Sequence, residues 1–292
     1  MNYRHAYHAG NFADVVKHAI LALVITHLKR KATPFRVIDT HAGAGIYDLR
    51  AEAAQKTGEW QNGIGRLIGP EAAPIPAGPS QILKPYLDIV RAMNPAGQLL
   101  RYPGSPRLAR ALMRAGDQLV ASELHPEDGA ALAALFARDP DTKVLRLDGW
   151  MALRSLLPPR ERRGVILIDP PFEEAGDLDR LREGLRQAVE RFATGIYLLW
   201  YPIKDTEPIA ALERSLLADG HARLLKVELS IRPPRSPDVL NGAGLFILNP
   251  PYLLDETLRQ LVPFLAGRLA QGPKGASQVV WLRGEKARRS LT

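Results

Sequence analysis

The sequence predicts an α/β fold whose centre is a doubly wound, mostly parallel sheet. Short, β-branched apolar runs alternate with helix-length amphipathic segments along most of the chain, and this alternation favours right-handed βαβ units. Acidic residues follow three successive predicted strands, behind a glycine-rich turn. Because ligands of such sheets bind outside the carboxyl ends of the strands, these residues also indicate where a binding site would lie.

The expected elements follow one another in a regular order. A first helix over residues 12–30 has a broad apolar face and ends in the basic run Lys29-Arg30-Lys31, which suits the helix dipole. Further helices are expected at 107–115, 126–138, 150–157, 178–192 and 209–217. Strands are expected at 35–38, 118–122, 143–147, 165–168, 195–200, 224–231 and 245–248. A Pro- and Gly-rich link without a helix joins the last two strands, so they should form an antiparallel hairpin at the sheet edge.

Residues 50–104 depart from this alternation. They contain Pro70, Pro74, Pro76 and Pro79 close together and a helix-like piece over 81–93, but no clear strand followed by a helix. We therefore expect a small, mostly helical subdomain inserted over 50–104. The main domain would then consist of residues 1–49 and 105–292.

The composition limits the possible functions. The chain has 292 residues, with 39 Lys and Arg against 31 Asp and Glu, a net charge of +8, and a basic balance favours a polyanionic partner such as nucleic acid. It contains no cysteine, which excludes disulfides, thiolate metal sites and a cysteine nucleophile. Cytosine ring-carbon methylation through a thiolate adduct and Cys-ligated zinc deamination are thereby excluded.

Membrane and metal sites are not expected. No stretch approaches the roughly 20 apolar residues of a membrane span, and the polar N-terminus lacks a signal-peptide segment, so a cytoplasmic protein is expected. His5 and His8 suggest metal ligands at first sight. No carboxylate or thiol is suitably spaced to complete such a site, so no metal is expected.

The stretch Asp169-Pro-Pro-Phe172 follows the apolar run 164–168 and carries the most chemical information. The Asp169 carboxylate and the Pro170 carbonyl can accept the two N–H bonds of an exocyclic amine, and Phe172 can stack on its ring. The alternative is a Pro-Pro turn that closes a strand, with Asp169 as an ordinary turn residue. Asn249-Pro-Pro-Tyr252 matches the same pattern. We interpret it as a structural turn, because it follows what is expected to be the last strand of the sheet.

The other strand ends suggest a pocket for an adenosine-bearing cofactor. Gly43 and Gly45 allow close approach of the backbone to a ligand, Glu123 can take both ribose hydroxyls, and Asp148, followed by Gly149, can accept from an adenine amine. The gap between Gly45 and Glu123 far exceeds the usual spacing of about 20 residues, and the insertion accounts for it. A nicotinamide cofactor that transfers hydride would give Asp169-Pro-Pro-Phe172 no role in the reaction, so a methyl-transfer cofactor is favoured.

The chain resembles the RlmJ family, which methylates adenine N6 in large-subunit (23S) ribosomal RNA. The resemblance spans nearly the whole chain and is carried by Tyr3-Arg-His5, Lys17-His18, Asp39-Thr-His-Ala-Gly-Ala-Gly45, Tyr102-Pro-Gly-Ser-Pro106, Glu123-Leu-His-Pro126, Asp148-Gly149, Asp169-Pro-Pro and Leu199-Trp-Tyr-Pro202. It implies a class I S-adenosylmethionine-dependent methyltransferase fold with a small helical insertion. This chain has Phe172 where the family motif usually has Tyr. Stacking survives that change, but a hydrogen bond from a phenol would not.

The resemblance also implies roles for individual residues. Asp169 would hold the target amine and also contact the cofactor. Those that would contact S-adenosylmethionine are His18, His41, Ser105, Glu123, Asp148 and Gly149. Those that would contact the RNA are Tyr3, Arg4, His5 and Lys17.

Two other functions remain open at this level. A DNA adenine-N6 methyltransferase would use the same chemistry, although the 50–104 insertion is short and lacks a basic helix for reading sequence. A non-catalytic, methyltransferase-like RNA-binding protein is the other alternative, and the intact Asp169 and glycine turn argue against it. For the RNA enzyme, the target base must be flipped or unpaired, and we expect a monomer.

Overall fold

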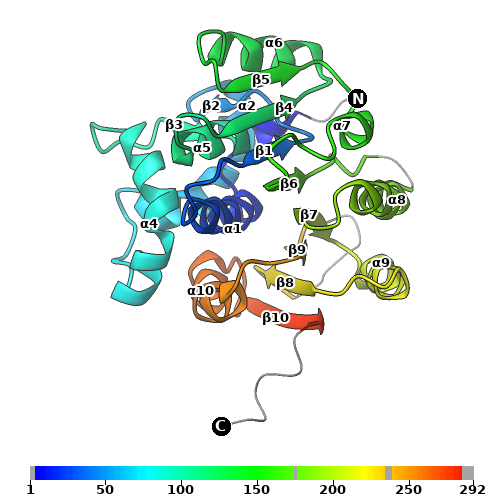
Figure 1. Cartoon of the computed structure of the whole chain (residues 1–292). Helices are drawn as coiled ribbons and strands as arrows, with labels where there is room; N and C mark the ends of the chain where they lie inside the picture. The colour runs from blue at the N-terminus through cyan, green and yellow to red at the C-terminus, as the bar shows by residue number, and fades with distance from the viewer. Residues whose placement is uncertain (1–3, 174–175, 234–238, 285–292) are drawn as a thin grey trace.

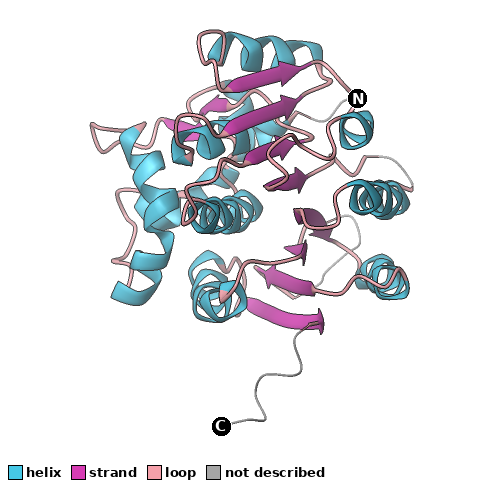
Figure 2. Ribbon diagram, in the orientation of Figure 1, coloured by secondary structure: helices cyan, strands magenta, loops and turns pink. Residues whose placement is uncertain are grey.

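The computed structural model describes residues 4–173, 176–233 and 239–284, and within them an eight-stranded sheet forms the centre (Figures 1 and 2). The strand order is β10-β8-β9-β7-β6-β1-β4-β5. The strands are β1 (Arg36–Asp39), β4 (Gln118–Ser122), β5 (Thr142–Leu145), β6 (Gly164–Ile168), β7 (Ile196–Ile203), β8 (Leu224–Ser230), β9 (Gly242–Leu248) and β10 (Ala276–Arg283). Strands β5, β4, β1, β6 and β7 pair in parallel, whereas β9 is antiparallel to β7 and β8. The predicted fold class and the antiparallel hairpin are confirmed.

The edge of the sheet beyond this hairpin was not predicted. Strand β10 pairs antiparallel with β8 and occupies the edge, so β8 is not the edge strand, and β9 lies between β8 and β7. The helix α10 (Leu254–Leu269) that leads to β10 was also missed. Its buried residues recur at helical spacing, but Pro263 within the helix obscures the pattern.

Helices cover both faces of the sheet, and each face has its own apolar cluster (Figure 2). Helices α1, α5 and α10 lie on one side, and α7, α8 and α9 lie on the other (Figure 1). The remaining bounds are α1 (Phe12–Leu28), α5 (Ser105–Leu112), α6 (Pro126–Leu135), α7 (Gly149–Ser155), α8 (Asp177–Arg191) and α9 (Thr206–Ala218). This arrangement is the doubly wound architecture that the alternating sequence pattern predicts.

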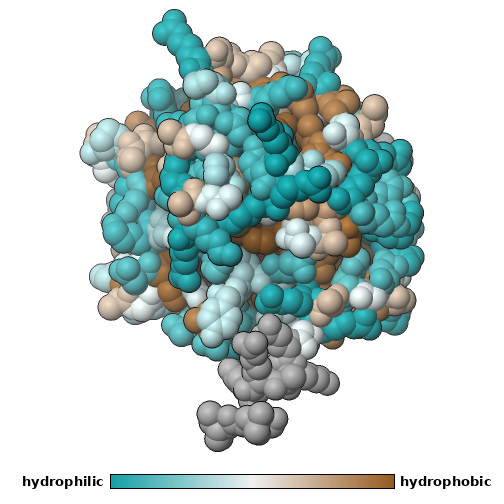
Figure 3. All heavy atoms as spheres, viewed as in Figure 1, coloured by the Kyte–Doolittle hydropathy of each residue, from teal (hydrophilic) through white to brown (hydrophobic). Residues whose placement is uncertain are grey.

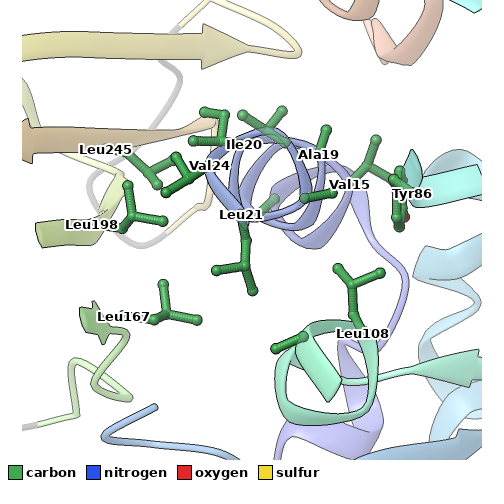
Figure 4. Close-up of a cluster of buried hydrophobic side chains, with 14 of the residues drawn as sticks. Val15, Ala19, Ile20, Leu21, Val24, Tyr86, Leu108, Leu167, Leu198 and Leu245 are labelled. Atoms are coloured by element: carbon green, nitrogen blue, oxygen red, sulfur yellow. The ribbon is translucent and has the colours of Figure 1, made fainter. Parts of the chain in front are cut away.

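Helix α1 is buried on nearly all sides rather than on one broad face. Asn11 caps its N-terminus by accepting a hydrogen bond from the Asp14 amide at 3.0 Å. Its apolar side chains face Leu198 and Leu245 of the sheet on one side and Leu108 of α5 on another (Figure 4). Helix α4 (Ala77–Ala92), from the region between β1 and α5, covers it from outside, where Tyr86 lies near Val15 (Figure 4). Polar residues on this helix are therefore forced into the interior.

Residues between β1 and α5 form mainly helices. These are α2 (Glu52–Thr57), the 3-10 helix η2 (Glu59–Asn62), α3 (Gly65–Ile68) and α4 (Ala77–Ala92). Short strands β2 (Ile46–Asp48) and β3 (Arg101–Pro103) pair antiparallel at the base of this segment. The division of the chain into two domains at residues 50 and 104 stays a prediction.

The direction of β9 separates the two Pro-Pro motifs. Because β9 runs antiparallel to β7, its last residue, Leu248, pairs with Tyr197 near the start of β7. Asn249 therefore lies near the amino ends of the parallel strands, whereas Asp169 lies at their carboxyl ends. The Asn249 side-chain amide donates to the carbonyls of Ala193 and Gly195, both at 2.8 Å. These bonds support the interpretation of this motif as a structural turn. The separation comes from the strand's direction, since β10 and not β9 is the last strand.

Among the described residues, no helix combines the length and apolar character needed to cross a membrane. The face of the molecule in Figure 3 is mostly hydrophilic, with hydrophobic side chains in scattered areas.

Candidate active site

A cavity beside the carboxyl ends of β1, β4 and β6 collects most of the predicted site residues. Its volume is about 370 Å³, within the range of pockets that hold small molecules. The predicted residues that line it are His5, Lys17, His18, His41, Gly43, Ser105, Glu123, Asp148, Gly149, Asp169 and Pro170. Arg4, Gly45 and Phe172 lie outside this lining, and Tyr3 lies outside the described residues.

The glycine turn after β1 needs its glycines for two different reasons. Gly43 and Gly45 both have positive φ, at 62° and 80°. A Cβ on Gly43 would lie 2.2 Å from the Tyr47 hydroxyl, and one on Gly45 would lie 2.7 Å from Leu135 of α6. Gly43 thus shapes the cavity wall, whereas Gly45 packs against α6 and supports the turn from behind.

Glu123 and Asp148 hold the backbone around the cavity. The two oxygens of Glu123 accept hydrogen bonds from the amides of Gly43 and His125, each at 2.7 Å. Asp148 caps α7, since its Oδ1 accepts from the amides of Trp150 at 2.9 Å and Met151 at 3.1 Å. A carboxylate oxygen can accept more than one hydrogen bond. Both groups therefore keep capacity for a ligand while performing a structural task.

Gly149 lets the turn after β5 approach the turn after β1. A Cβ at this position would lie 2.5 Å from both His41 Cε1 and the Thr40 carbonyl oxygen. We expect Gly149→Ala to lower the free energy of unfolding by about 1–3 kcal/mol and to weaken cofactor binding, because the two turns must separate. Thermal unfolding and calorimetry would measure both effects. Gly78→Ala is the matched control, since a Cβ there meets nothing within 4 Å, and equal effects of the two changes would contradict this account.

Two neutral imidazoles face the cavity. Burial lowers the pKa of His18 to about 3 and that of His41 to about 4. His18 Nδ1 lies 2.8 Å from the Tyr102 hydroxyl, and His41 Nδ1 lies 2.8 Å from the Thr40 hydroxyl. Both rings are therefore uncharged near neutral pH and do not repel a cationic ligand.

Asp39, at the end of β1, was not predicted as a site residue. Burial raises its pKa to about 7, although the Ser105 hydroxyl and the His41 amide act against this shift. Neither of these two groups completes a well-formed hydrogen bond, and within the described structure both carboxyl oxygens are buried without a partner. The only sequence signal was its place before the glycine turn.

The raised pKa of Asp39 makes stability depend on pH. Its ordinary value is 3.8 and its value in the folded protein is about 7, so between these values the folded state binds more protons than the unfolded state. The contribution of Asp39 to the free energy of unfolding therefore falls as pH rises from about 4 to 7, by up to about 4 kcal/mol, and is constant above that. Asp39→Asn should remove this slope. Urea titrations of both proteins at several pH values would measure it, and parallel stability curves would contradict the assignment.

Asp169 reaches the cavity and is bound by Lys17. Lys17 Nζ contacts Asp169 Oδ2 and lies 2.9 Å from Asp14 Oδ1. Burial acts against its charge, but the two carboxylates outweigh burial and raise the pKa of Lys17. The Lys17 residue is only 4% exposed, so a contact with an RNA phosphate would require breaking buried ion pairs. The ion pairs indicate an internal role for Lys17 beside Asp169, and its contact with RNA stays a prediction.

Arg4 and His5, which are also expected to meet RNA, lie beside carboxylates of this chain. Arg4 lies 2.7 Å from Glu127 of α6. His5, the first residue of the 3-10 helix η1 (His5–Tyr7), lies 2.9 Å from Asp14 and lines the cavity. The N-terminal segment is thus attached at the side of the cavity, and roles of Arg4 and His5 in RNA binding stay predictions.

Phe172 packs against an aromatic residue to which no role was assigned from the sequence. Its ring lies 5.6 Å from the Trp200 ring with a tilt of 55°. Lys17 Nζ lies 5.8 Å from the Trp200 centroid, so Trp200 also borders the Lys17–Asp169 pair. Phe172 has a φ of 53°, a conformation that is costly for a bulky residue and is often found at functional sites. Only the position of Trp200 near the end of a predicted strand could have indicated it.

Among the described residues, no group of three or more His, Cys, Asp or Glu side chains is arranged to hold a metal ion.

Comparisons with known proteins agree with this geometry. The family described as "Ribosomal RNA large subunit methyltransferase D, RlmJ" matches residues 32–283. The "Ribosomal RNA large subunit methyltransferase J" of Escherichia coli K12 is 40% identical over 97% of this chain and 99% of that protein. The protein of the same name from Haemophilus influenzae is 36% identical over 98% of this chain and 100% of its own length.

A solved structure supports the same relationship. A crystal structure of a Legionella pneumophila protein superposes with a TM-score of 0.84 at 30% identity, and the match covers 94% of this chain and 98% of that one. The family match confirms the predicted methyl-transfer chemistry and S-adenosylmethionine as the methyl donor. This chain belongs to the RlmJ family of ribosomal RNA large subunit methyltransferases.

Proposed function

We propose that this protein transfers a methyl group from S-adenosylmethionine to the exocyclic N6 of a specific adenine in 23S ribosomal RNA. The observation that carries the proposal is the position of Asp169 and Pro170 in the wall of the cavity that also contains Gly43, Glu123 and Gly149. Acceptors for an amine therefore adjoin the residues expected to hold the methyl donor. The names of the relatives support a large-subunit ribosomal RNA as the substrate.

The residues of the cavity fit S-adenosylmethionine. Glu123 is placed to accept from ribose hydroxyls, and Asp148 from an adenine amine, as each keeps free acceptor capacity. The uncharged His18 and His41 do not oppose a sulfonium. When bound, this cofactor supplies an electrophilic methyl group.

Asp169 has one oxygen available for the substrate. Lys17 occupies Oδ2, while Oδ1 makes no hydrogen bond to the described residues. The Asp169 side chain is 14% exposed and opens into the cavity. Its Oδ1 and the Pro170 carbonyl are placed to accept the two protons of an adenine N6 amine, which localises the nitrogen lone pair and orients it. After the N–C bond forms, Oδ1 is also placed to take the proton that the nitrogen must lose.

Access to this point requires an unstacked base. An adenine inside a duplex cannot reach a cavity wall, so the target is flipped out or unpaired. Phe172 and Trp200 provide aromatic surface beside Asp169 on which the base can stack. We further propose that the enzyme acts as a monomer in the cytoplasm, and that residues 50–104 form an inserted helical subdomain that closes over α1.

A direct comparison of substrates tests the function. The purified protein should methylate protein-free 23S RNA at one adenine and leave duplex DNA unmodified, as measured with radiolabelled donor. Mass mapping of the RNA should place the methyl group on N6. Methylation of duplex DNA at an equal rate, or a product methylated at a ring position, would refute the proposal.

A further inference from the structure

A dense group of basic side chains lies at the amino ends of the central parallel strands, on the side of the sheet opposite the cavity. It is formed by the α1–β1 loop and the α7–β6 loop, with Arg114 from the α5–β4 loop. Its eight basic residues are Lys29, Arg30, Lys31, Arg36, Arg114, Arg160, Arg162 and Arg163. The carboxylates among them are Asp117, which binds Arg114 at 3.0 Å, and Glu161, which binds Arg36 at 2.9 Å. Since the whole chain has a net charge of only +8, much of its positive surplus lies here.

Two arginines fix the shape of this edge. Arg163 donates to the carbonyls of Leu28 and Thr33, and Arg114 donates to the carbonyl of Lys31 at 2.9 Å. Their guanidinium carbons lie 5.8 and 5.7 Å from the Phe35 ring. The α1–β1 loop is therefore held by several hydrogen bonds and presents its own basic side chains from a fixed backbone.

Four of the cations are exposed and have no ion-pair partner among the described residues. They are Arg30, Lys31, Arg160 and Arg162, which we call the basic edge. Asp139 and Asp141, farther along the same side of the sheet, are bound to Arg110 at 2.6 and 3.0 Å. Burial together with Arg30, Arg163 and Lys31 lowers the pKa of His27, as expected in a positive field.

The chemistry of the basic edge fits a phosphate backbone better than a protein or a membrane. The large apolar side chains that are exposed in the described structure, Leu124, Met151, Tyr252 and Leu253, all lie elsewhere in the sequence. A protein interface usually needs buried aromatic or aliphatic anchors, and an interfacial helix needs an apolar face. Next to the basic edge there is instead a hollow of about 480 Å³, lined in part by Thr33, Arg36 and Arg160. Phosphate contacts require only such outward-facing cations.

We propose that the basic edge binds the phosphate backbone of the large ribosomal RNA at a segment distinct from the one that carries the target adenine. The basic edge lies at the amino end of β6 and Asp169 follows its carboxyl end. The five residues of this strand place the two about 20 Å apart. Two contacts on one RNA raise the effective concentration of the target at the cavity. The proposal rests on the proposed function, because it takes the same RNA as the partner.

The test compares two variants with equal net charge. The basic-edge variant carries Arg30→Gln, Lys31→Gln, Arg160→Gln and Arg162→Gln. The control variant carries Lys84→Gln, Arg91→Gln, Arg186→Gln and Arg214→Gln, which remove four exposed cations elsewhere. Each variant is assayed on protein-free 23S RNA and on a short hairpin that contains the unmethylated target adenine, and binding is measured at several salt concentrations.

The basic-edge variant should bind 23S RNA about tenfold or more weakly than the control variant. The slope of log affinity against log salt should become about 3 units shallower, as expected for four lost phosphate contacts. Its turnover on the short hairpin should match that of the control variant. Equal binding of 23S RNA by both variants, or an equal loss on the hairpin, would overturn the proposal. If the wild-type protein methylates neither RNA, the proposed function fails, while the binding curves still decide about the basic edge.

Discussion

Replacement of Asp169 by Ala should reduce the rate of methyl transfer by about 10³-fold or more, while affinity for S-adenosylmethionine changes little. The carboxylate is the group placed to accept from the target amine, and preorganised groups of this kind contribute factors of about 10²–10³ each. The cofactor residues at the ends of β1, β4 and β5 are untouched by this change. A single-turnover assay measures the rate, and calorimetry measures the affinity.

The second Pro-Pro motif offers the matched control for this experiment. Asn249→Ala removes hydrogen bonds to the carbonyls of Ala193 and Gly195, just before the amino end of β7 and away from the cavity. It should therefore lower stability but leave kcat unchanged. Asp169→Asn keeps the size and one acceptor and should retain more activity than Asp169→Ala. Near-normal turnover in Asp169→Ala would end the assignment of this residue to the substrate amine.

Replacement of Lys17 by Met should lower the free energy of unfolding by about 3–5 kcal/mol and also abolish most activity. The change leaves the carboxylates of Asp14 and Asp169 without their shared cation, and removal of one partner of a buried ion pair typically costs this much. Asp169 would also lose the group that fixes Oδ2. Urea denaturation would give the stability, and kcat and KM would be measured at a temperature where the variant is folded.

Lys226 provides the comparison that separates stability from catalysis. It is 13% exposed and lies 2.8 Å from Glu213 and 3.7 Å from Glu228, far along the sheet on β8. Lys226→Met should destabilise the protein but leave kcat unchanged when folded protein is assayed. If Lys17→Met retains normal kcat under the same conditions, Lys17 has only a structural role.

The sequence predicted the parts of the fold that local patterns determine. The strand 118–122 coincides with β4, and Pro126 marks the start of α6, because a short apolar run and a first-turn proline are local signals. Asp169 was placed at a strand end by the same reasoning. The rest of the site depends on contacts between distant parts of the chain. Lys17 is 152 positions from Asp169, and nothing in its own helix indicates that a covering segment would bury it.

Other errors had a similar origin. Helix α1 looked amphipathic because its polar residues were assumed to face water, whereas Asp14, Lys17 and His18 are buried and bind one another or Tyr102. The edge strand β10 contains exposed and half-buried residues and lacks a buried run, so its pairing with β8 could not be read from hydrophobicity. Asp148 both caps a helix and lines the cavity.

The reversal of strand order at β1 has a consequence for how such an enzyme can change its target. Three of the residues expected to hold the donor, Gly43, Glu123 and Asp148, follow β1, β4 and β5 on one side of the reversal. Asp169, Phe172 and Trp200 come from β6 and β7 on the other. With these expected roles, the strand ends would form two half-sites with separate tasks. New acceptor specificity can be acquired by altering the loops of one half, while the other half continues to bind the same methyl donor.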